Sequence, residues 1–353
     1  MKSDVMLEAL PPGKLPGWLL QKVLPVSPRD ANVIVGPGLG MDAAAVIVGD
    51  RVIVAKNDPI TFASDGSAEH LVEVNANDVA CMGATPRWLL LTALLPHGVT
   101  PAAVLNQFGE LREACSRRSV DLIGGHTEIV PGLVRPILVG MMLGETSRDE
   151  LIEPGQAQPG DMLLLTKALA IEGSALLAKE RRAELLERIG DHNLQLAEDL
   201  LRTPGISVVR DADAARRAGG VTALHDPTEG GFATAVREIA TVSHAGADID
   251  AHAIPILPET RAIADALGLD PLGMLASGAL LIAARAEAVP AIKRSVEAEG
   301  IAINVVGRLT VDRGAFAMNT PSGQRELPEF AVDEVARELA RPIKGQQSSA
   351  TGR

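Results

Sequence analysis

Aromatic residues, cysteines and basic residues are all scarce in this chain. It has 353 residues, of which 2% are aromatic and none is tyrosine, so a platform of stacked rings for single-stranded nucleic acid is not expected. Its 33 Lys and Arg are outnumbered by 45 Asp and Glu, which gives a formal net charge of -12. Binding to a phosphate backbone needs clustered basic residues. We therefore expect no nucleic-acid partner.

The two cysteines, Cys81 and Cys115, are too few for a disulfide framework or a zinc cluster, which fits a reducing cytoplasm. Cysteine is most often a small core residue, and we expect that role for Cys81. Acidic residues interrupt the N-terminal segment, and no later stretch is a run of roughly 18 uncharged apolar residues. The composition predicts a cytoplasmic protein without membrane contact.

The apolar periodicity predicts mixed strands and helices, hence an α/β or α+β fold. Residues 149–160 mix Pro, Gly and polar residues as a connector does, so we expect an N-terminal domain over residues 1–148 and a C-terminal domain over residues 161–342. The polar tail, residues 343–353, is expected to be disordered. Strands are expected at residues 43–48, 52–55, 88–95, 120–123, 134–143, 162–166, 247–250, 278–284 and 302–308, and helices at 18–24, 68–82, 101–117, 172–189, 191–202 and 226–243.

Three aspartates of the N-terminal part are candidate metal ligands. Asp42 follows a glycine-rich loop, Asp58 ends an apolar strand, and Asp78 lies in the predicted helix, where the 3.6-residue period puts Asn75 on the same face. Each aspartate alone could be a turn or cap residue. A carboxylate in an apolar setting is costly unless it is paired or metal-bound. Since Mg²⁺ binds one or two carboxylates together with waters and phosphates, the three motifs predict a magnesium-phosphate site.

The glycine-rich loop before Asp42 contains Gly36, Gly38 and Gly40. Its backbone N–H groups could approach phosphate oxygens. A dinucleotide fingerprint needs a helix after such a loop, whereas a hairpin is predicted here, and no Walker A sequence occurs. An ordinary turn therefore remains the alternative.

A second glycine motif, Gly124-Gly125-His126-Thr127-Glu128, follows a predicted strand directly. The end of a strand is a usual place for a ligand-binding loop in α/β folds. His126 could contact phosphate or act as an acid or base, or it could be only a structural hydrogen-bonding residue.

The motif Asp226-Pro227-Thr228-Glu229 can be explained as a capping box, with Asp at the N-cap, Pro at N1 and Glu at N3. Gly230 and Gly231 would then lie in the first turn, where each costs about 1 kcal/mol relative to alanine. Such a pair suggests close approach to the backbone, and a helix N-terminus favours an anion. We expect a functional role for Asp226, with bare capping as the alternative.

In this order the motifs resemble the aminoimidazole-ribonucleotide synthetase superfamily, over about residues 13 to 310. The superfamily includes thiamine-monophosphate kinase, selenophosphate synthetase and the hydrogenase-maturation carbamoyl dehydratase. The wording Asn-Asp-Pro-Ile-Thr-Phe and Asp-Pro-Thr-Glu-Gly-Gly is most similar to the hydrogenase-maturation branch. The resemblance rests on Asp42-Ala-Ala, Asp58 after a strand, Asn75-x-x-Asp78, Gly-Gly125-His-Thr, Asp226-Pro-Thr-x-Gly-Gly and Gly307-Arg308.

The resemblance implies a two-domain fold, a homodimer in which N-terminal strands form a barrel across the subunits, and ATP bound with Mg²⁺ between the domains. It implies Asp42, Asp58, Asp78 and Asp226 as metal ligands and Asp58, Asp78 and His126 as catalytic residues. The implied nucleotide-binding residues are Gly36, Gly38, Gly40, Asn75, Gly124, Gly125, Asp226, Gly230 and Gly231.

Three positions depart from the pattern. The dehydratase carries a carbamoyl-accepting cysteine at its extreme C-terminus, whereas this chain has no cysteine after Cys115. Several relatives have an acidic residue at the place of His126. The kinase branch usually has a Glu-Gly-Val-His-Phe-like segment where this chain has Thr61-Phe62-Ala63-Ser64-Asp65.

We therefore expect an ATP- and Mg²⁺-dependent enzyme that resembles hydrogenase expression/formation proteins. It would transfer a phosphoryl group to, or activate, an oxygen of an unknown acceptor, either a small molecule or a group borne on a protein. One alternative is a small-molecule kinase that resembles thiamine-monophosphate kinase. The other is an assembly or sensor protein that binds ATP without turnover.

Overall fold

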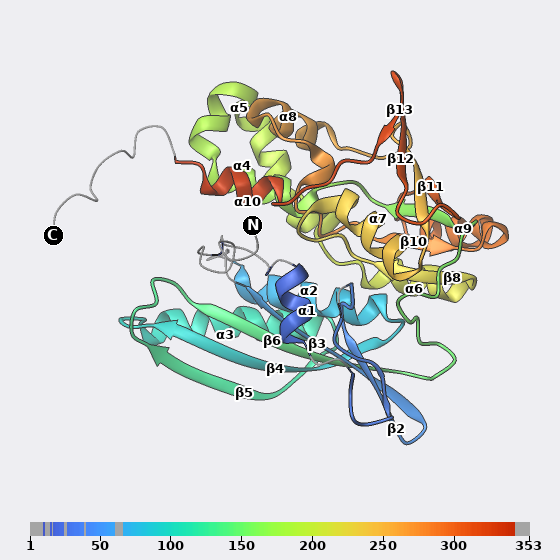
Figure 1. The fold of residues 1–353 in the computed structure, drawn as a ribbon. Coiled ribbons are helices and arrows are strands. Elements are labelled where there is room, and N and C mark those ends of the chain that lie inside the picture. The colour runs from blue at the N-terminus through green and yellow to red at the C-terminus, as the bar shows by residue number, and fades with distance from the viewer. Residues whose placement is uncertain are drawn as a thin grey trace, which may run out of the picture.

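The computed structural model describes residues 10, 15, 17–24, 27–38, 40–60 and 66–342 (Figure 1). The predicted tail, residues 343–353, and the departure at residues 61–65 lie outside the described residues. Two β-sheets with their helices form two layers of the molecule, one above the other in Figure 1. In the part of the chain that is described, no helix is long and apolar enough to cross a membrane.

The first sheet has six strands in the order β1-β2-β3-β6-β4-β5. Helices α2 and α3 belong to this half of the chain, which begins with the short helix α1. The elements are α1 (Gly17–Val23), β1 (Val33–Val35), β2 (Ala44–Val48), β3 (Arg51–Ile60), α2 (Ser67–Cys81), β4 (Thr85–Pro96), α3 (Pro101–Arg117), β5 (Asp121–Val130) and β6 (Ile137–Thr146).

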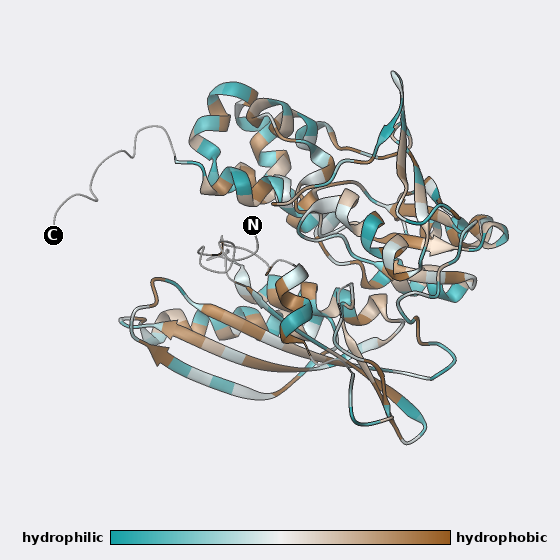
Figure 2. Cartoon of the chain, in the orientation of Figure 1, coloured by the Kyte–Doolittle hydropathy of each residue, from teal (hydrophilic) through white to brown (hydrophobic). Residues whose placement is uncertain are grey.

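Strand β4, which lies between β6 and the edge strand β5, shows how this sheet is covered. Its alternate residues Leu89, Leu91 and Leu95 are almost fully buried, while Trp88 and Leu90 between them are only half-buried. Side chains alternate between the two faces of a strand, so one face lies in the core and the other is partly open. Apolar residues recur along β4 and β6 in Figure 2. The core face packs against α2, whose close approach to β6 requires Gly140, because a Cβ there would lie 2.9 Å from Asn75 Nδ2.

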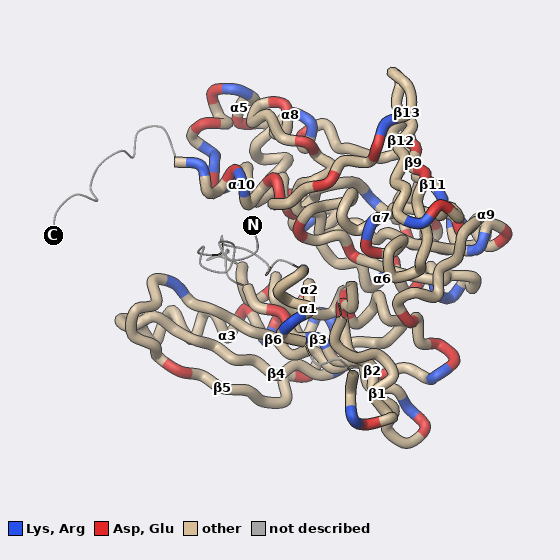
Figure 3. Tube along the Cα trace, in the orientation of Figure 1, with Lys and Arg blue, Asp and Glu red and all other residues tan. Residues whose placement is uncertain are grey.

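The second sheet has seven strands in the order β13-β12-β9-β11-β7-β10-β8. Its elements are β7 (Met162–Thr166), α4 (Ile171–Glu180), α5 (Arg182–Asp199), α6 (Val209–Ala218), β8 (Val221–His225), α7 (Gly231–Val242), β9 (Gly246–Asp250), α8 (Pro258–Leu267), β10 (Leu281–Ala284), α9 (Val289–Ala298), β11 (Ile303–Thr310), β12 (Phe316–Thr320), β13 (Gly323–Glu326) and α10 (Glu334–Ala340). Charges of both signs occur along α5 (Figure 3), where Arg182 pairs with Asp191 and Glu198 at 2.5 Å each.

The predicted bounds of α3 and β7 are confirmed, and the predicted helix over residues 68–82 is α2, displaced by one residue. The predicted helix over residues 172–189 is wrong, because α4 ends at Glu180 and α5 begins at Arg182. The buried guanidinium of Arg181 donates to the carbonyl oxygens of Glu338 and Arg341, which fixes the chain at this break.

The two layers meet along α2. This helix contacts α6 and β8 of the second half of the chain. Asn77 is fully buried there; its Nδ2 donates to Ile206 O at 2.9 Å and its Oδ1 accepts from Val208 N at 2.8 Å. Two turns earlier, His70 Nε2 lies 2.7 Å from Glu172 Oε1 of α4. Because α2 also carries Asn75 and Asp78, these contacts position the predicted site residues against the second sheet.

Candidate functional site

The end of β3 and the middle of α2 bring the first group of predicted residues together. The backbone N–H of Asp58 donates to Asn75 Oδ1 at 3.0 Å, and Asn75 Nδ2 donates to Leu71 O at 2.9 Å. Asn75 is thus an anchor between helix and strand, and both of its amide atoms are engaged. The predicted common face of Asn75 and Asp78 is turned toward β3.

Lys56 lies between two of the predicted carboxylates. Its Nζ is 3.3 Å from Asp58 Oδ2 and 3.0 Å from Asp78 Oδ2, and its side chain is only 15% exposed. Lys56 and Asp58 are two residues apart on β3, so they point to the same face of the sheet. Burial alone would lower the pKa of Lys56, yet the carboxylates of Asp78, Asp58 and Asp42 raise it above its ordinary value. The ammonium is therefore permanently charged.

Asp226 reaches this group from the second sheet. It directly follows β8 and is 1% exposed. Its Oδ1 accepts a hydrogen bond from Cys81 Sγ at 3.7 Å, while its buried Oδ2 has no hydrogen-bond partner among the described residues. Burial and the nearby carboxylate of Asp42 raise the pKa of Asp226 to about 6. Burial and the carboxylate of Asp226 also raise the pKa of Asp78 well above its ordinary value.

The capping explanation of Asp226 is wrong. Helix α7 begins at Gly231, its N-cap is Gly230, and no side chain caps it there. The backbone N–H of Gly230 instead donates to Asp333 Oδ2 at 2.8 Å. The two glycines have a packing reason, since a Cβ on Gly231 would lie 2.6 Å from Leu272 O and one on Gly230 would lie 2.3 Å from Thr234 Oγ1. Atoms of the protein itself therefore approach the backbone of Gly230 and Gly231 closely. Nucleotide binding at these two glycines stays a prediction.

His225 joins Asp42 to the second sheet. Its Nδ1 is 3.0 Å from Asp42 Oδ2, and its Nε2 is 2.7 Å from Glu238 Oε2 of α7. Burial by itself lowers the pKa of His225, but the carboxylates of Asp42 and Glu238 raise it well above its ordinary value. The site therefore holds two cations, Lys56 and His225, among its carboxylates.

The residues fit a hard divalent cation whose coordination shell is completed by phosphate oxygens. A buried carboxylate oxygen without a partner, on Asp226, and carboxylates with raised pKa values are what a bound cation would stabilise. Within the described ranges, no group of three or more His, Cys, Asp or Glu side chains could hold a metal ion by itself. Magnesium needs only one or two carboxylates when a substrate supplies phosphate oxygens.

The glycine-rich loop borders a pocket of about 340 Å³ beside these carboxylates. Gly40 has φ +71°, which favours glycine, and a Cβ there would lie 3.0 Å from Val242 Cγ1 of α7. The loop is therefore packed against the second half of the chain. Residues lining the pocket are Gly36, Pro37, Met41, Asp42, Ala43, Ala44, Ala55, Lys56 and Asn57.

The predicted ligand-binding loop after Ile123 is wrong. Strand β5 continues from Asp121 through both glycines to Val130 at the edge of the sheet. Gly125 is required by the approach of β4, because a Cβ there would lie 1.8 Å from Leu91 O. No loop forms where the sequence suggested one.

The structure does not bring His126 to the aspartates within one chain. Asp58, Gly140, Leu91 and Gly125 lie in one row across β3, β6, β4 and β5, so three strand spacings, about 14 Å, separate Asp58 from Gly125. His126 is in the next row and points to the opposite face. Its side chain is 67% exposed, with Nε2 3.5 Å from Glu128 Oε2.

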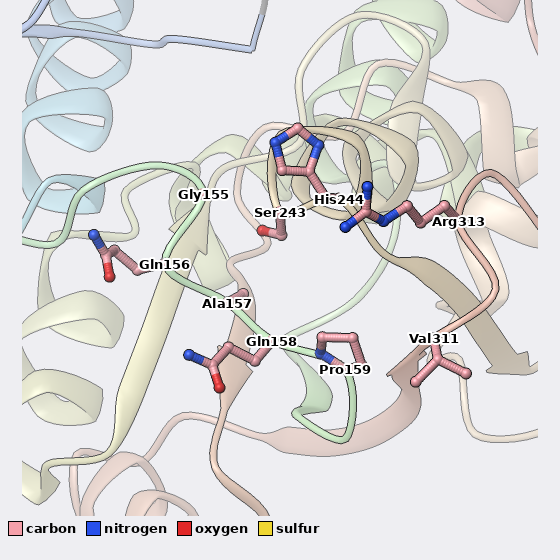
Figure 4. Close-up of a pocket in the computed structure, with 9 residues that line it drawn as sticks. All are labelled: Gly155, Gln156, Ala157, Gln158, Pro159, Ser243, His244, Val311 and Arg313. Atoms are coloured by element: carbon pink, nitrogen blue, oxygen red, sulfur yellow. The ribbon is translucent and has the colours of Figure 1, made fainter.

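A second pocket, of about 440 Å³, lies in the later half of the chain (Figure 4). It is formed by the proposed connector, the turn between α7 and β9 and the turn after β11, and Arg313 and His244 are its basic residues. None of the predicted site residues lines it. The lining residues are Gly155, Gln156, Ala157, Gln158, Pro159, Ser243, His244, Val311 and Arg313.

Comparison with known proteins agrees with this arrangement. Residues 40–146 match the N-terminal domain model of AIR synthase related proteins, and residues 158–318 match the C-terminal domain model. The carbamoyl dehydratase HypE of Cupriavidus necator is 31% identical over 266 residues, which is 71% of each chain. This chain belongs to the AIR synthase-related family. A putative hydrogenase expression/formation protein of Methanocaldococcus jannaschii is 26% identical over 336 residues, 92% of this chain and 96% of the relative.

Solved structures of family members share the fold. Escherichia coli HypE has a TM-score of 0.69 at 21% identity and covers 81% of this chain and 88% of its own. A HypE structure in complex with ATP has a TM-score of 0.67 at 23% identity and covers 90% of this chain and 91% of its own. A thiamine monophosphate kinase from Aquifex aeolicus has a TM-score of 0.61 at 16% identity and covers 81% of this chain and 93% of its own. The family and the two-domain α/β fold that the resemblance implied are thus confirmed.

Sequence reasoning missed Lys56 and His225. Both stand directly beside the quoted motifs, Lys56 two residues before Asp58 and His225 one residue before Asp226. The signal was available in part, since clustered carboxylates in a buried setting require compensating cations. Which of the chain's basic residues would supply them depends on the tertiary structure.

Proposed function

We propose that this protein is an ATP-dependent enzyme that works with Mg²⁺ and transfers a phosphoryl group to, or activates, an oxygen of an acceptor. One observation carries the proposal: the carboxylates of Asp58 and Asp78 lie against the buried ammonium of Lys56, and Asp42 and Asp226, the latter from the second half of the chain, interact with it electrostatically. So many like charges are costly to bury. A metal ion bound to the phosphates of a nucleotide would compensate the charge of these carboxylates.

Asp42, Asp58, Asp78 and Asp226 are the residues that would hold the metal. Magnesium would neutralise the charge that develops on the transferred phosphoryl group. The chain itself would supply positioning. The pocket at the glycine loop would bind the phosphates. Asn75 would hold α2 against β3 through its hydrogen bond with Asp58.

The names of relatives support the nucleotide and the class of reaction. The relatives include carbamoyl dehydratases and hydrogenase expression/formation proteins, and one HypE structure holds ATP. We keep the acceptor general, a small molecule or a protein-borne group. The two cysteines of this chain, Cys81 and Cys115, are both buried. Burial and the neighbouring Asp226 raise the pKa of Cys81 well above its ordinary value, which argues against a nucleophilic thiol in the site.

Calorimetry of ATP binding with Mg²⁺ tests the site. Asp78→Asn should abolish Mg²⁺-dependent ATP binding while the circular dichroism spectrum stays unchanged. Asp50→Asn, in the exposed turn between β2 and β3, is the matched control and should bind as the parent does. Undiminished affinity in Asp78→Asn would overturn the assignment.

Product analysis separates the reaction types. Phosphate retained on an acceptor would favour the kinase alternative, whereas release of phosphate with a changed acceptor would favour activation. No hydrolysis above the Asp78→Asn level, with any candidate acceptor, would favour a protein that binds ATP without turnover.

We also infer a homodimer in the cytoplasm. The half-buried apolar residues Trp88, Leu90 and Leu94 on the open face of β4 support a partner sheet, and the two free cysteines fit a reducing compartment. Sedimentation equilibrium tests the dimer. Leu90→Glu should give a monomer, and a parent protein that sediments as a monomer would refute the inference.

A further inference from the structure

Lys56 holds the place that a metal ion would need. Its ammonium lies 3.3 Å from Asp58 Oδ2 and 3.0 Å from Asp78 Oδ2, and these are carboxylates to which the proposed function assigns the metal. The Lys56 and Asp78 side chains are only 15% and 6% exposed, and the Asp58 side chain is 37% exposed. Because Asp78 is shielded from water, placing its ionised carboxylate near that of Asp58 is costly without a cation.

The ammonium and a divalent cation therefore compete. Both would use oxygens of the same two side chains, and like charges at such separations repel strongly at low dielectric. Metal binding to Asp58 and Asp78 thus requires the Lys56 ammonium to leave its present position. Lysine can do this, because its charge sits on a flexible four-carbon stem.

The pocket beside the glycine loop is where the ammonium can go. Lys56 already lines this pocket of about 340 Å³, together with Gly36, Pro37 and Asn57. The backbone N–H groups of a glycine-rich loop can bind phosphate oxygens. An ammonium that turns into this space would meet the phosphates of a nucleotide.

We propose that Lys56 is an exchangeable counter-ion: its ammonium neutralises Asp58 and Asp78 while nucleotide is absent, and it moves to the nucleotide phosphates when a divalent cation takes the two carboxylates. This inference rests on the proposed function for the identity of the nucleotide. It makes Lys56 a residue that contacts substrate. It also explains why a lysine lies among carboxylates that are proposed to bind a metal ion.

The variant Lys56→Met keeps the length of the side chain and removes its charge. It should bind Mn²⁺ alone at least about tenfold more tightly than the parent, because no ammonium competes for Asp58 and Asp78. It should bind the non-hydrolysable ATP analogue AMPPCP with Mg²⁺ about tenfold more weakly, because the phosphates lose a cation. Calorimetry measures both constants. Lys293→Met on α9 is the control with the same change in net charge, and it should leave both unchanged.

Effects of opposite sign distinguish this role from a structural one. If Lys56 only stabilised the fold, the variant would lose affinity for Mn²⁺ and for the nucleotide together, and that result would overturn the inference. Unchanged Mn²⁺ affinity would overturn it as well. A parent protein that binds neither nucleotide nor metal would instead refute the proposed function.

Loss of folding in metal-free buffer is also informative. Carboxylate repulsion without the ammonium would cause it, and added Mn²⁺ should then restore the circular dichroism spectrum of Lys56→Met. A spectrum that stays unfolded in Mn²⁺, both for this variant and for Lys56→Gln, would overturn the inference.

Discussion

His225, from the second sheet, faces Asp42, from the first, with Nδ1 and Oδ2 3.0 Å apart. On its other side the imidazole lies 2.7 Å from Glu238 Oε2, and the residue is only 6% exposed. The glycine loop that ends at Asp42 is therefore fixed to α7 through one side chain. A loop that would line a phosphate pocket is positioned by the opposite half of the chain.

His225→Gln should weaken Mg²⁺-dependent ATP binding by about 10- to 100-fold, which is the usual cost of losing a partner that orients a metal-binding carboxylate. Calorimetry measures this affinity. The metal-free thermal midpoint should fall as well, because the buried cation between Asp42 and Glu238 is lost. Glu238→Gln keeps His225 and should lose less affinity, so an equal loss in both variants would contradict a role of His225 in positioning Asp42.

Asp226 should make the metal-free protein more stable in mild acid. Burial and Asp42 raise its pKa in the folded state to about 6, from 3.8. The folded state then binds the proton more tightly than the unfolded state, so the free energy of unfolding rises as the pH falls from about 7 toward 4. Asp226→Asn removes the cost of keeping this buried carboxylate ionised, and it should stabilise the metal-free protein at pH 7.5 by up to roughly 3 kcal/mol.

Urea unfolding at pH 5 and pH 7.5 checks this prediction. The parent should be more stable at pH 5, and the difference should shrink in Asp226→Asn. Saturating Mg²⁺ with ATP should also reduce it, because a bound cation stabilises the ionised carboxylate. A parent whose stability falls steadily from pH 7.5 to pH 5 would contradict the raised pKa.

The sequence predicted the elements that carry Asp58 and Asp78, because local information determines them. The 3.6-residue period of α2 puts Asn75 and Asp78 on one face, and the run before Asp58 is plainly a strand. A glycine pair was harder to interpret. Gly125 looks like the start of a loop, yet it lies within β5 because the backbone of β4 comes too close for a side chain.

The partners of these carboxylates could not be predicted in the same way. Lys56 and Asp78 are 22 residues apart in the sequence, and His225 meets Asp42 from the opposite half of the chain. Such pairs depend on how two sheets dock. Asp226 shows the reverse error, since a local capping pattern was complete, but α7 starts five residues later and the side chain turns to Cys81 instead.

The ion pair between His70 and Glu172 should make the interface between the two halves sensitive to pH. Burial by itself lowers the pKa of His70, but Glu172 raises it above its ordinary value of 6.5. Its stabilisation is therefore complete below pH 6.5 and is lost as the pH rises through the higher folded-state value. His70→Gln should lower the free energy of unfolding by about 1–3 kcal/mol at pH 6 and by less at pH 8.5. Urea unfolding at both values measures this, and a loss independent of pH would show that the charge of His70 does not matter.

Asn77 should link stability to nucleotide binding. Its side chain makes two buried hydrogen bonds, to Ile206 O and from Val208 N, and it directly precedes Asp78 on α2. Asn77→Ala leaves both backbone groups without a partner, which should lower the free energy of unfolding by about 2–5 kcal/mol. Because the same bonds hold α2 against the second sheet, Mg²⁺-dependent ATP binding should weaken in the folded variant as well. Asn106→Ala, which removes an exposed bond to Glu110 on α3, is the control and should change neither quantity. If Asn77→Ala lost stability but kept the parent's affinity, the position of Asp78 would not depend on this contact.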